Sequence, residues 1–231
     1  MDYVFDPAPP AALEIAGMDE YFPVRRIYCV GRNYAAHTRE MGHDPDREPP
    51  FFFTKPADAV VANGRTIPFP SETRNLHHEI ELVAAIGREA NNVAVANAND
   101  YLFGYAVGND LTRRDLQMEA REKGRPWDTG KAFDHSAPMT AIHPIQSTGV
   151  LDRGRIWLEV NGTMRQEADL KDLIWSVPEV IATLSRLFVL RPGDLVFTGT
   201  PAGVGAVDPG DIMTGSVAGL PVLETSIGPS E

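Results

Sequence analysis

The sequence contains a single cysteine, Cys29, among its 231 residues. One thiol cannot form an intramolecular disulfide, and this agrees with a reducing compartment. Because Cys29 lies in the apolar stretch 27–30, we expect a small buried hydrophobic side chain rather than a catalytic thiol. The fold must therefore be stabilised without covalent cross-links.

Positive charge and long apolar runs are also scarce. The 21 Lys and Arg residues are outnumbered by 32 Asp and Glu, which gives a formal net charge of −11. Nucleic acid and anionic lipid are bound through a basic field, so we expect neither as a partner and favour small molecules. No apolar run approaches the roughly 18 residues that span a bilayer, and the N-terminus lacks the regions of a signal peptide. We therefore expect a cytoplasmic protein with no membrane partner.

Two common catalytic signatures are missing. The glycine-rich segment 198–205 lacks the Gly-Lys-Ser/Thr ending of a phosphate-binding loop. Ser216 has neighbouring glycines at the wrong offsets for the nucleophile elbow of a serine hydrolase. These absences exclude a P-loop nucleotide site and a serine nucleophile of that type.

The pattern of short apolar segments predicts an α+β fold that is mostly β, with a few peripheral helices. Prolines and alanines near the start predict an N-terminal arm over 1–23, followed by a single domain over 24–231 with ordered structure from about Val24. Asn161 and Gly162 predict a two-residue hairpin turn. Capping boxes at Thr112 and Ser176 and a cap at Asn33 predict the helices. Strands are expected at 27–30, 51–54, 59–62, 66–69, 77–87, 101–109, 155–160, 163–167, 194–198 and 220–226.

Glu79 and Glu81 are the first candidates for a functional site. Alternation in 77–87 places them on one face of a strand, roughly 6.6 Å apart at the backbone, with Ile80 and Leu82 on the other face. Two unpaired carboxylates at about 4 Å repel by roughly 4 kcal/mol at an effective dielectric near 20. Water, a basic partner or a cation must therefore accompany them. Because the sequence neighbours are apolar, Mg²⁺ is the favoured solution, although an exposed strand face would also explain the pattern.

Asp110 strengthens the metal interpretation. It follows a long apolar strand and precedes a capped helix, a position at which enzymes often place a ligand. A role in capping the helix is the alternative, but Thr112 already serves that purpose. We therefore favour Asp110 as the third carboxylate ligand.

Three other residues have chemistry that suits catalysis. His37 and Glu40 stand at i and i+3 on one helix, where a carboxylate can orient an imidazole base; an ordinary surface pair explains the same spacing. Lys131 lies in the aromatic-rich segment 127–134, which predicts partial burial. It either binds a developing oxyanion or forms a salt bridge to Asp128 or Asp134, and the sequence leaves both open.

Five ordered motifs occur at residues 29–37 (CVGRNYAAH), 75–81 (NLHHEIE), 109–117 (NDLTRRDLQ), 131–134 (KAFD) and 198–201 (TGTP). Together they resemble the fumarylacetoacetate hydrolase family. The resemblance runs from about Arg25 to the C-terminus, and the absence of a large N-terminal domain makes the chain similar to the short acylpyruvase and fumarylpyruvate hydrolase branch. It implies a mixed, partly rolled-up β-sheet resembling a roll or sandwich, and a homodimer.

The resemblance also implies roles for individual residues. The metal ligands for Mg²⁺ or Mn²⁺ would be Glu79, Glu81 and Asp110, and His37 with Glu40 would activate water. The oxyanion partner would be Lys131. Side chains that hold substrate oxygens would be those of Gln117 and Thr200.

The implied reaction is hydrolysis of a carbon–carbon bond in an acylpyruvate. Segment 41–53 resembles the lid of fumarylpyruvate hydrolases from the gentisate route of aromatic breakdown, and His43 or Arg47 would then meet the far carboxylate. A simple acylpyruvase, an oxaloacetate decarboxylase, or an isomerase or decarboxylase of ring-cleavage products fits the same ligands. A non-enzymatic scaffold that uses metal only for stability is the hypothesis from a different class.

Overall fold

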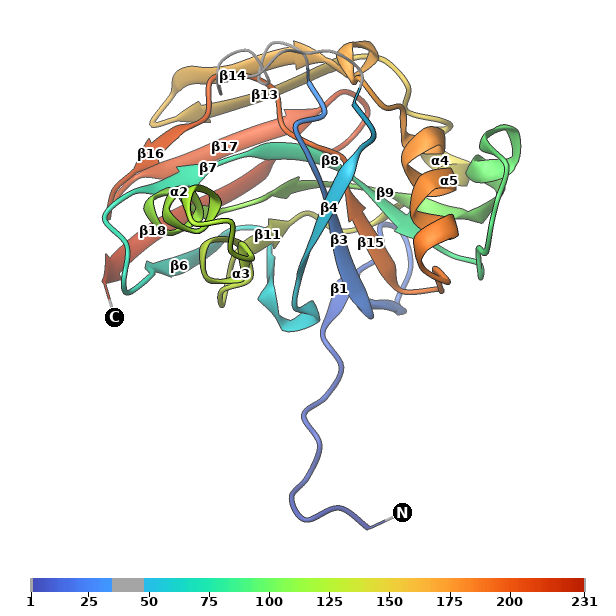
Figure 1. Cartoon of the computed structure of the whole chain (residues 1–231), viewed down its shortest axis with the longest axis horizontal. Helices are drawn as coiled ribbons and strands as arrows, with labels where there is room; N and C mark the ends of the chain where they lie inside the picture. The colour runs from blue at the N-terminus through green and yellow to red at the C-terminus, as the bar shows by residue number, and fades with distance from the viewer. Residues whose placement is uncertain (1, 35–47, 231) are drawn as a thin grey trace.

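Two curved β-sheets form the body of the protein (Figure 1). The computed structural model describes residues 2–34 and 48–230. The larger sheet runs in the order β4 (Phe51–Lys55), β3 (Arg26–Gly31), β15 (Asp194–Phe197), β8 (Ile80–Ile86), β9 (Leu102–Asn109), β11 (Ala137–Met139) and β5 (Val60–Ala62), with β12 (His143–Pro144) also on β9. It is mixed, because β3 and β15 pair in parallel, as do β5 and β11, while the remaining pairs are antiparallel.

The second sheet packs against the first. Its order is β14 (Thr163–Asp169), β13 (Arg155–Val160), β17 (Ile212–Val217), β18 (Leu223–Ser230) and β6 (Arg65–Phe69). A three-stranded sheet joins β10 (Thr112–Arg113), β7 (Leu76–His78) and β16 (Gly205–Val207). This arrangement confirms the mostly β, mixed and partly rolled-up fold that the sequence predicts.

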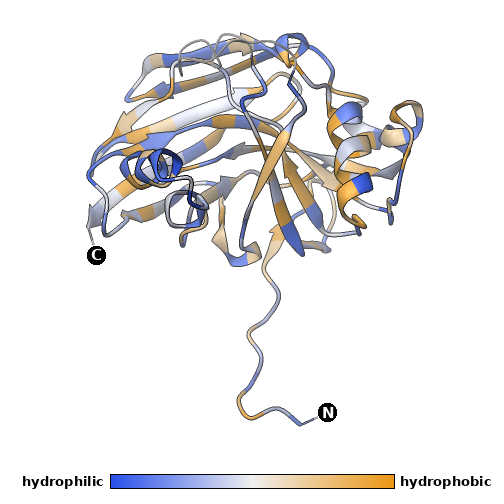
Figure 2. Ribbon diagram, in the orientation of Figure 1, coloured by the Kyte–Doolittle hydropathy of each residue, from blue (hydrophilic) through white to orange (hydrophobic). Residues whose placement is uncertain are grey.

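The helices of the described residues are short and lie at the periphery of the sheets (Figure 1). They are α2 (Arg114–Glu122), α3 (Asp128–Lys131), α4 (Ile145–Thr148) and α5 (Val177–Leu187), with 3-10 turns η1 (Ala57–Ala59), η2 (Val95–Tyr101) and η3 (Leu170–Asp172). The predicted capping box at α5 is confirmed, since Ser176 and Glu179 cap each other reciprocally. In Figure 2, α5 carries apolar residues on one side and polar residues on another, as expected for a helix that covers a core. No helix in the described part of the chain combines the length and apolar character needed to cross a bilayer.

Strand β8 is buried on both faces, and its alternation divides the core in two. Ile80, Leu82, Ala84 and Ile86 join the main core with residues of the second sheet. On the opposite face, Val83 lies in a smaller core that includes Leu13. Each large apolar side chain buried in this way contributes about 1.5–3 kcal/mol relative to exposure. The predicted alternation of this strand is therefore confirmed.

The predicted hairpin at Asn161 is also confirmed. Strands β13 and β14 pair across Asn161 and Gly162, whose φ angles of 52° and 72° match a primed turn. A second turn, between β5 and β6, contains Gly64 with a φ of 76°. However, the strands on either side of it belong to different sheets, because β5 pairs with β11 and β6 pairs with β18.

Three boundaries differ from the sequence predictions. Ordered structure begins before Val24, because β1 (Ala12–Glu14) and β2 (Tyr21–Pro23) form a hairpin whose Leu13 and Phe22 are buried in the smaller core. The predicted strand over 77–87 is interrupted at Glu79, between β7 and β8. The capping box at Thr112 is wrong, since Thr112 lies in β10 and its hydroxyl donates to Glu79 and to the Asp110 carbonyl instead.

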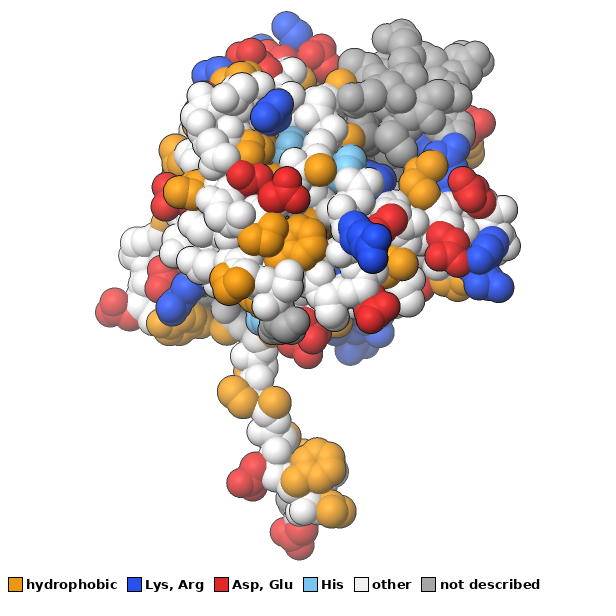
Figure 3. All heavy atoms as spheres, turned by 90° about the vertical axis from the view of Figure 1, so that its left-hand side faces the viewer, with side chains coloured by type: hydrophobic (Ala, Val, Ile, Leu, Met, Phe, Trp, Pro, Cys, Tyr) orange, Lys and Arg blue, Asp and Glu red, His pale blue; other side chains and the backbone are white. Residues whose placement is uncertain are grey.

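Residues before the first hairpin project away from the body of the protein (Figures 1 and 3). Tyr3, Val4 and Phe5 are all exposed. This part of the predicted arm over 1–23 is therefore extended, as the prolines suggested. The helix predicted after Asn33 falls on residues outside the described ranges.

Candidate metal centre

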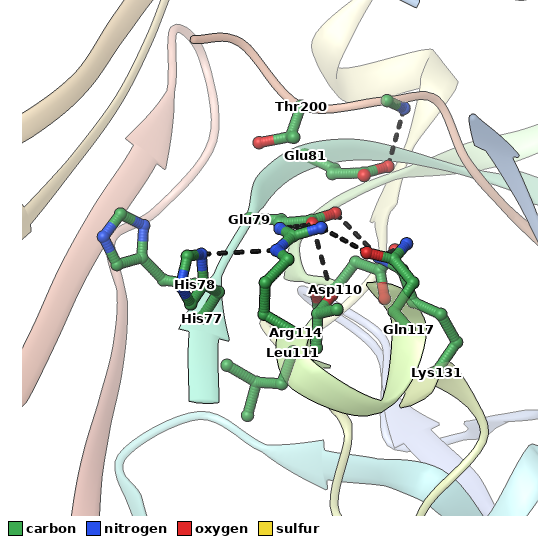
Figure 4. A network of polar contacts seen from close by, with 12 residues as sticks. His77, His78, Glu79, Glu81, Asp110, Leu111, Arg114, Gln117, Lys131 and Thr200 are labelled. Carbon is green, nitrogen blue, oxygen red and sulfur yellow. Dashed lines mark hydrogen bonds and ion pairs between the residues drawn. The ribbon is translucent and has the colours of Figure 1, made fainter. Parts of the chain in front are cut away.

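The carboxylates of Glu79, Glu81 and Asp110 converge at one buried point. Their ligand atoms lie within 4.8 Å of one another, and the three residues are between 0% and 5% exposed. Figure 4 shows the three side chains meeting beneath the loop that carries Thr200. The predicted grouping of these three residues is therefore what the structure shows.

The register of β8 with β9 brings the carboxylates together. Ile80 pairs with Asn109, so Glu79, just before β8, meets Asp110, just after β9. The backbone N–H of Asp110 donates to the Glu79 carbonyl at 2.8 Å, and the N–H of Glu79 donates to the Asn109 side chain at 2.8 Å. Glu81 accepts a hydrogen bond from the backbone N–H of Gly199 at 2.6 Å. Three acids from two strand ends are thus held by main-chain contacts.

Basic side chains surround the carboxylates, contrary to the apolar surroundings suggested by the sequence neighbours. The Lys131 ammonium lies 2.8 Å from Glu79 Oε2 and 2.7 Å from Asp110 Oδ2. Arg114 pairs with Glu79 through its guanidinium, and Lys55 Nζ lies 2.8 Å from Asp110 Oδ1. The three cations balance the formal charge of the three acids.

Burial and charge shift the pKa values of this centre in opposite directions. Burial raises the pKa of Glu81 well above its ordinary value, and the charges of Asp110 and Glu79 raise it further. For Lys131, burial lowers the pKa, but Asp110 and Glu79 outweigh burial and the pKa is raised. A further positive charge close to the three acids therefore stabilises their ionised form.

The donor set fits a hard divalent cation. Three carboxylates supply only oxygen ligands, the type that Mg²⁺ and Mn²⁺ prefer. One carboxylate oxygen of Glu81 accepts the hydrogen bond from the Gly199 N–H. The ammonium group of Lys131 lies between the carboxylates of Glu79 and Asp110. A divalent ion at these oxygens would compete with Lys131 for them and leave its N–H groups for a substrate oxygen.

A cavity opens over the carboxylates, and several predicted residues line it. Lys131, Gln117 and Thr200 all border this cavity. Gln117 Oε1 accepts from Arg114 at 2.5 Å, and Thr200 Oγ1 accepts from Gln166 Nε2 at 2.8 Å. The alternative of a salt bridge from Lys131 to Asp128 or Asp134 is not what the structure shows, because Lys131 pairs with Glu79 and Asp110.

Four predicted site residues lie outside the described residues. These are His37, Glu40, His43 and Arg47. Their roles as the water-activating pair and as contacts to a far carboxylate stay predictions.

The sequence interpretation missed Lys55 and Arg114. Lys55 ends β4 and donates to the carbonyl oxygens of Leu111 and Lys131, at 3.1 and 2.5 Å. The signal was a lysine at the end of the aromatic strand segment 51–54. Arg114 begins α2 and was treated only as part of a helix start, although it follows Asp110 by four residues.

His77 is neutral next to this centre. Its Nε2 lies 2.8 Å from Asn75 Oδ1, and Arg114 Nε donates to its Nδ1 at 3.3 Å. Burial and the positive charge of Arg114 lower the pKa of His77 to about 4. It therefore supports Arg114 as a hydrogen-bond acceptor.

Comparison with known proteins supports the family resemblance over most of the chain. Residues 26–228 match the family model of the fumarylacetoacetate (FAA) hydrolase C-terminal domain. The chain is 46% identical to the fumarylpyruvate hydrolase of a Ralstonia species over 193 residues, which is 83% of this chain and 100% of that protein. It is 42% identical to the human mitochondrial oxaloacetate tautomerase over 85% of this chain and 88% of that protein.

A solved structure agrees closely with the fold. The fumarylpyruvate hydrolase of Pseudomonas aeruginosa, in complex with Mn²⁺ and pyruvate, superposes with a TM-score of 0.97 and 55% identity, covering 99% of this chain and 100% of that one. The motifs, the acidic centre and these similarities agree. The chain belongs to the fumarylacetoacetate hydrolase family.

Proposed function

We propose that the protein is a divalent-metal-dependent hydrolase that cleaves the carbon–carbon bond of an acylpyruvate, with fumarylpyruvate, cleaved to fumarate and pyruvate, as the favoured substrate. The observation that carries this proposal is the buried group of Glu79, Glu81 and Asp110 at the base of a cavity that Lys131 also lines. Similarity to a fumarylpyruvate hydrolase that binds Mn²⁺ and pyruvate supports it.

The metal would be held by Glu79, Glu81 and Asp110, with Mg²⁺ or Mn²⁺ as the candidate ions. When bound, the cation supplies electron withdrawal from the 2-oxo acid, which makes a pyruvate enolate a better leaving group. Carboxylate oxygens are ligands that both ions accept, and availability in the cell contributes to the choice between them.

Residues of the chain supply the rest of the chemistry. His37, oriented by Glu40, takes a proton from water, and the resulting hydroxide adds to the distal carbonyl carbon of the substrate. Lys131 donates to the oxyanion that forms there. When the carbonyl re-forms, the bond to the methylene carbon breaks and its electron pair passes to the pyruvate enolate. The proton that His37 took from water is then given to that carbon, which completes pyruvate. Gln117 and Thr200 hold substrate oxygens.

Metal titration coupled to a pyruvate assay tests this function. Glu79→Ala or Asp110→Ala is expected to abolish metal-dependent turnover, because each removes a ligand. His37→Ala is expected to retain metal binding and lose hydrolysis. An unaffected His37→Ala enzyme would contradict the proposed base, and normal turnover by Glu79→Ala would contradict the metal site.

Chemistry on oxaloacetate is the second candidate, because the 42% identical human relative is named an oxaloacetate tautomerase. An oxaloacetate decarboxylase would use the same enolate, and a simple acylpyruvase the same acidic centre. Rates for fumarylpyruvate, acetylpyruvate and oxaloacetate measured side by side decide among these functions. A preference for oxaloacetate of tenfold or more would replace the favoured assignment.

Three wider expectations belong to the same proposal. We expect a homodimer, a cytoplasmic location and a place in aromatic catabolism by the gentisate route. Light scattering should give a mass twice the 25.3 kDa of one chain. The buried single thiol of Cys29 is compatible with a reducing compartment, and cell fractionation tests the location.

A further inference from the structure

The far end of the proposed substrate needs a partner that the acidic centre does not supply. His43 and Arg47, predicted for this role, lie outside the described residues, and two described arginines offer a further contact. Seven charged side chains line the described cavity, namely Arg32, Arg114, Arg121, Lys131, Glu79, Glu81 and Asp110. The acids lie at the buried base, where Arg114 and Lys131 pair with them. Arg32 and Arg121 are half-buried, so they mark the mouth of the cavity.

Helix α2 connects the base of the cavity to its mouth. Arg114, Gln117 and Arg121 stand at i, i+3 and i+7, which places them on one face of the helix. At 1.5 Å per residue, Arg121 lies about 10 Å along the axis from Arg114. Arg114 and Gln117 are buried, whereas Arg121 is half-buried. One face of α2 therefore carries polar side chains all the way from the acidic centre to the solvent-exposed mouth of the cavity.

Arg32 reaches the same cavity from the end of β3. Its guanidinium carbon lies 5.4 Å from the ring centroid of Phe51, which packs edge-on against Trp127 at 5.4 Å. The Phe51 ring lies directly over the preceding Gly31, where a Cβ atom would come within 2.0 Å of the end of the ring. Arg32 itself has a φ of 57°, an uncommon conformation for a non-glycine residue. These contacts position the guanidinium of Arg32 against an aromatic wall.

The two arginines influence each other electrostatically. Partial burial and the positive charge of Arg121 lower the pKa of Arg32, while the exposed Glu48 acts in the opposite direction. Two guanidinium groups that line the same cavity make its mouth a favourable place for an anion. The planar guanidinium also matches the two oxygens of a carboxylate.

We propose that Arg32 and Arg121 bind the distal carboxylate of a dicarboxylic acylpyruvate, so that the cavity selects substrates whose acyl group carries a second negative charge. This inference rests on the proposed function. The 2-oxo acid end lies at the acidic centre, and the extended acyl chain runs along α2 to the mouth. Fumarylpyruvate carries the second carboxylate, and acetylpyruvate lacks it.

Substrate comparison in two arginine variants tests the inference. The kcat/KM for fumarylpyruvate and for acetylpyruvate is measured with Mg²⁺ for the wild-type protein, Arg121→Gln and Arg32→Gln. Loss of one charge-assisted contact should lower the ratio of the two kcat/KM values by about tenfold or more, mainly through the KM for fumarylpyruvate. Arg121→Lys, which keeps the charge, should recover part of the ratio.

The control variant is Arg153→Gln, which removes the same unit charge from an exposed side chain outside the cavity. Its ratio should equal that of the wild type. A ratio within twofold of the wild type in both Arg121→Gln and Arg32→Gln, with the wild type active on both substrates, would overturn this inference and leave the proposed function intact. A wild-type protein that hydrolyses no acylpyruvate with metal would overturn the proposed function and this inference with it.

Discussion

At the scale of single residues, the acidic centre depends on matched charges. Glu79 and Asp110 pair with Lys131, Arg114 and Lys55, so the ionised carboxylates are compensated by cations of the chain itself. Removing one member of a buried pair leaves an uncompensated charge, which costs more than the pair contributes. Loss of the most deeply buried cation of the centre should therefore reduce the free energy of unfolding the most.

Lys55→Met should destabilise the metal-free protein by about 3 kcal/mol or more. The ion pair to Asp110 is 0% and 1% exposed at its two side chains, so water cannot replace the lost charge. Urea unfolding in the presence of a chelator measures the change. Lys123→Met removes an exposed pair to Glu119 and should cost less than about 0.5 kcal/mol. Equal stabilities of the two variants would contradict the role assigned to Lys55.

At the scale of elements, the contact of α2 with α3 positions Lys131, the proposed oxyanion partner. Gly130 of α3 packs against the backbone of Gln117, so that a Cβ atom there would lie 2.7 Å from the Gln117 nitrogen. The next residue, Lys131, carries the ammonium group of the centre. Displacement of this short helix would therefore move Lys131 relative to Glu79 and Asp110.

Gly130→Ala should lower kcat/KM by about tenfold or more, because small displacements of a catalytic group have large effects on rate. Thr129→Ala, which changes an exposed side chain of the same helix, is the matched control and should stay close to wild type. Steady-state kinetics and a thermal melt are measured on both variants. Wild-type kcat/KM in Gly130→Ala would show that the helix contact does not position Lys131.

Asp115, in the first turn of α2, contributes to the free energy of unfolding in a way that depends on pH. Asp115 accepts hydrogen bonds from Thr73 Oγ1 at 2.6 Å, from the Arg74 N–H at 2.9 Å and from the Leu116 N–H at 3.0 Å. Burial raises the pKa of Asp115, but these hydrogen bonds outweigh it, so the pKa lies below its ordinary value of 3.8. The ionised form is thus favoured by folding. Its stabilising effect is present above the unfolded-state pKa and is lost as the pH falls through the folded-state pKa.

Asp115→Ala should therefore cost about 1 kcal/mol at pH 7. The difference from the wild type should shrink as the pH falls below about 4. Urea unfolding of both proteins between pH 7 and pH 3 measures it. A difference that grows on acidification would contradict the assignment of an ionised Asp115.

At the scale of the whole molecule, two packed sheets support the site without help from a metal. Residues of β8, the strand that carries Glu81, belong to both cores, and these cores also include residues of the second sheet and of the hairpin β1–β2. Because Lys131, Arg114 and Lys55 pair with Glu79 and Asp110, we expect the fold to persist without a divalent ion. The scaffold hypothesis, in which the metal holds the fold, predicts the opposite.

A chelator should stop turnover and leave the protein folded. Far-UV circular dichroism is expected to stay unchanged, the melting temperature to fall modestly as the stabilisation by bound ion is lost, and Mg²⁺ to restore activity. Unfolding on chelation would support the structural role instead. Parallel measurements of ellipticity and pyruvate release separate the two outcomes.

Local patterns were enough to predict much of the fold and part of the site. The two-residue period of a strand assigned Ile80 and Leu82 to one core, and Asn161 with Gly162 identified a hairpin. Glu79 and Glu81 stood out because they are close in sequence. These features depend on neighbours within a few residues, which a sequence displays directly.

Pairing between distant segments was decided by the tertiary structure. The register of β8 with β9 brings Asp110 to Glu79, and the position of β4 brings Lys55 to the same carboxylates across a separation of 55 residues. The ionisation of a buried carboxylate depends on its burial and on the charged groups near it, and these come from every element packed around it. The sequence by itself therefore determined the faces of the strands and the identity of the acids. Only the folded chain decided which cations accompany the acids.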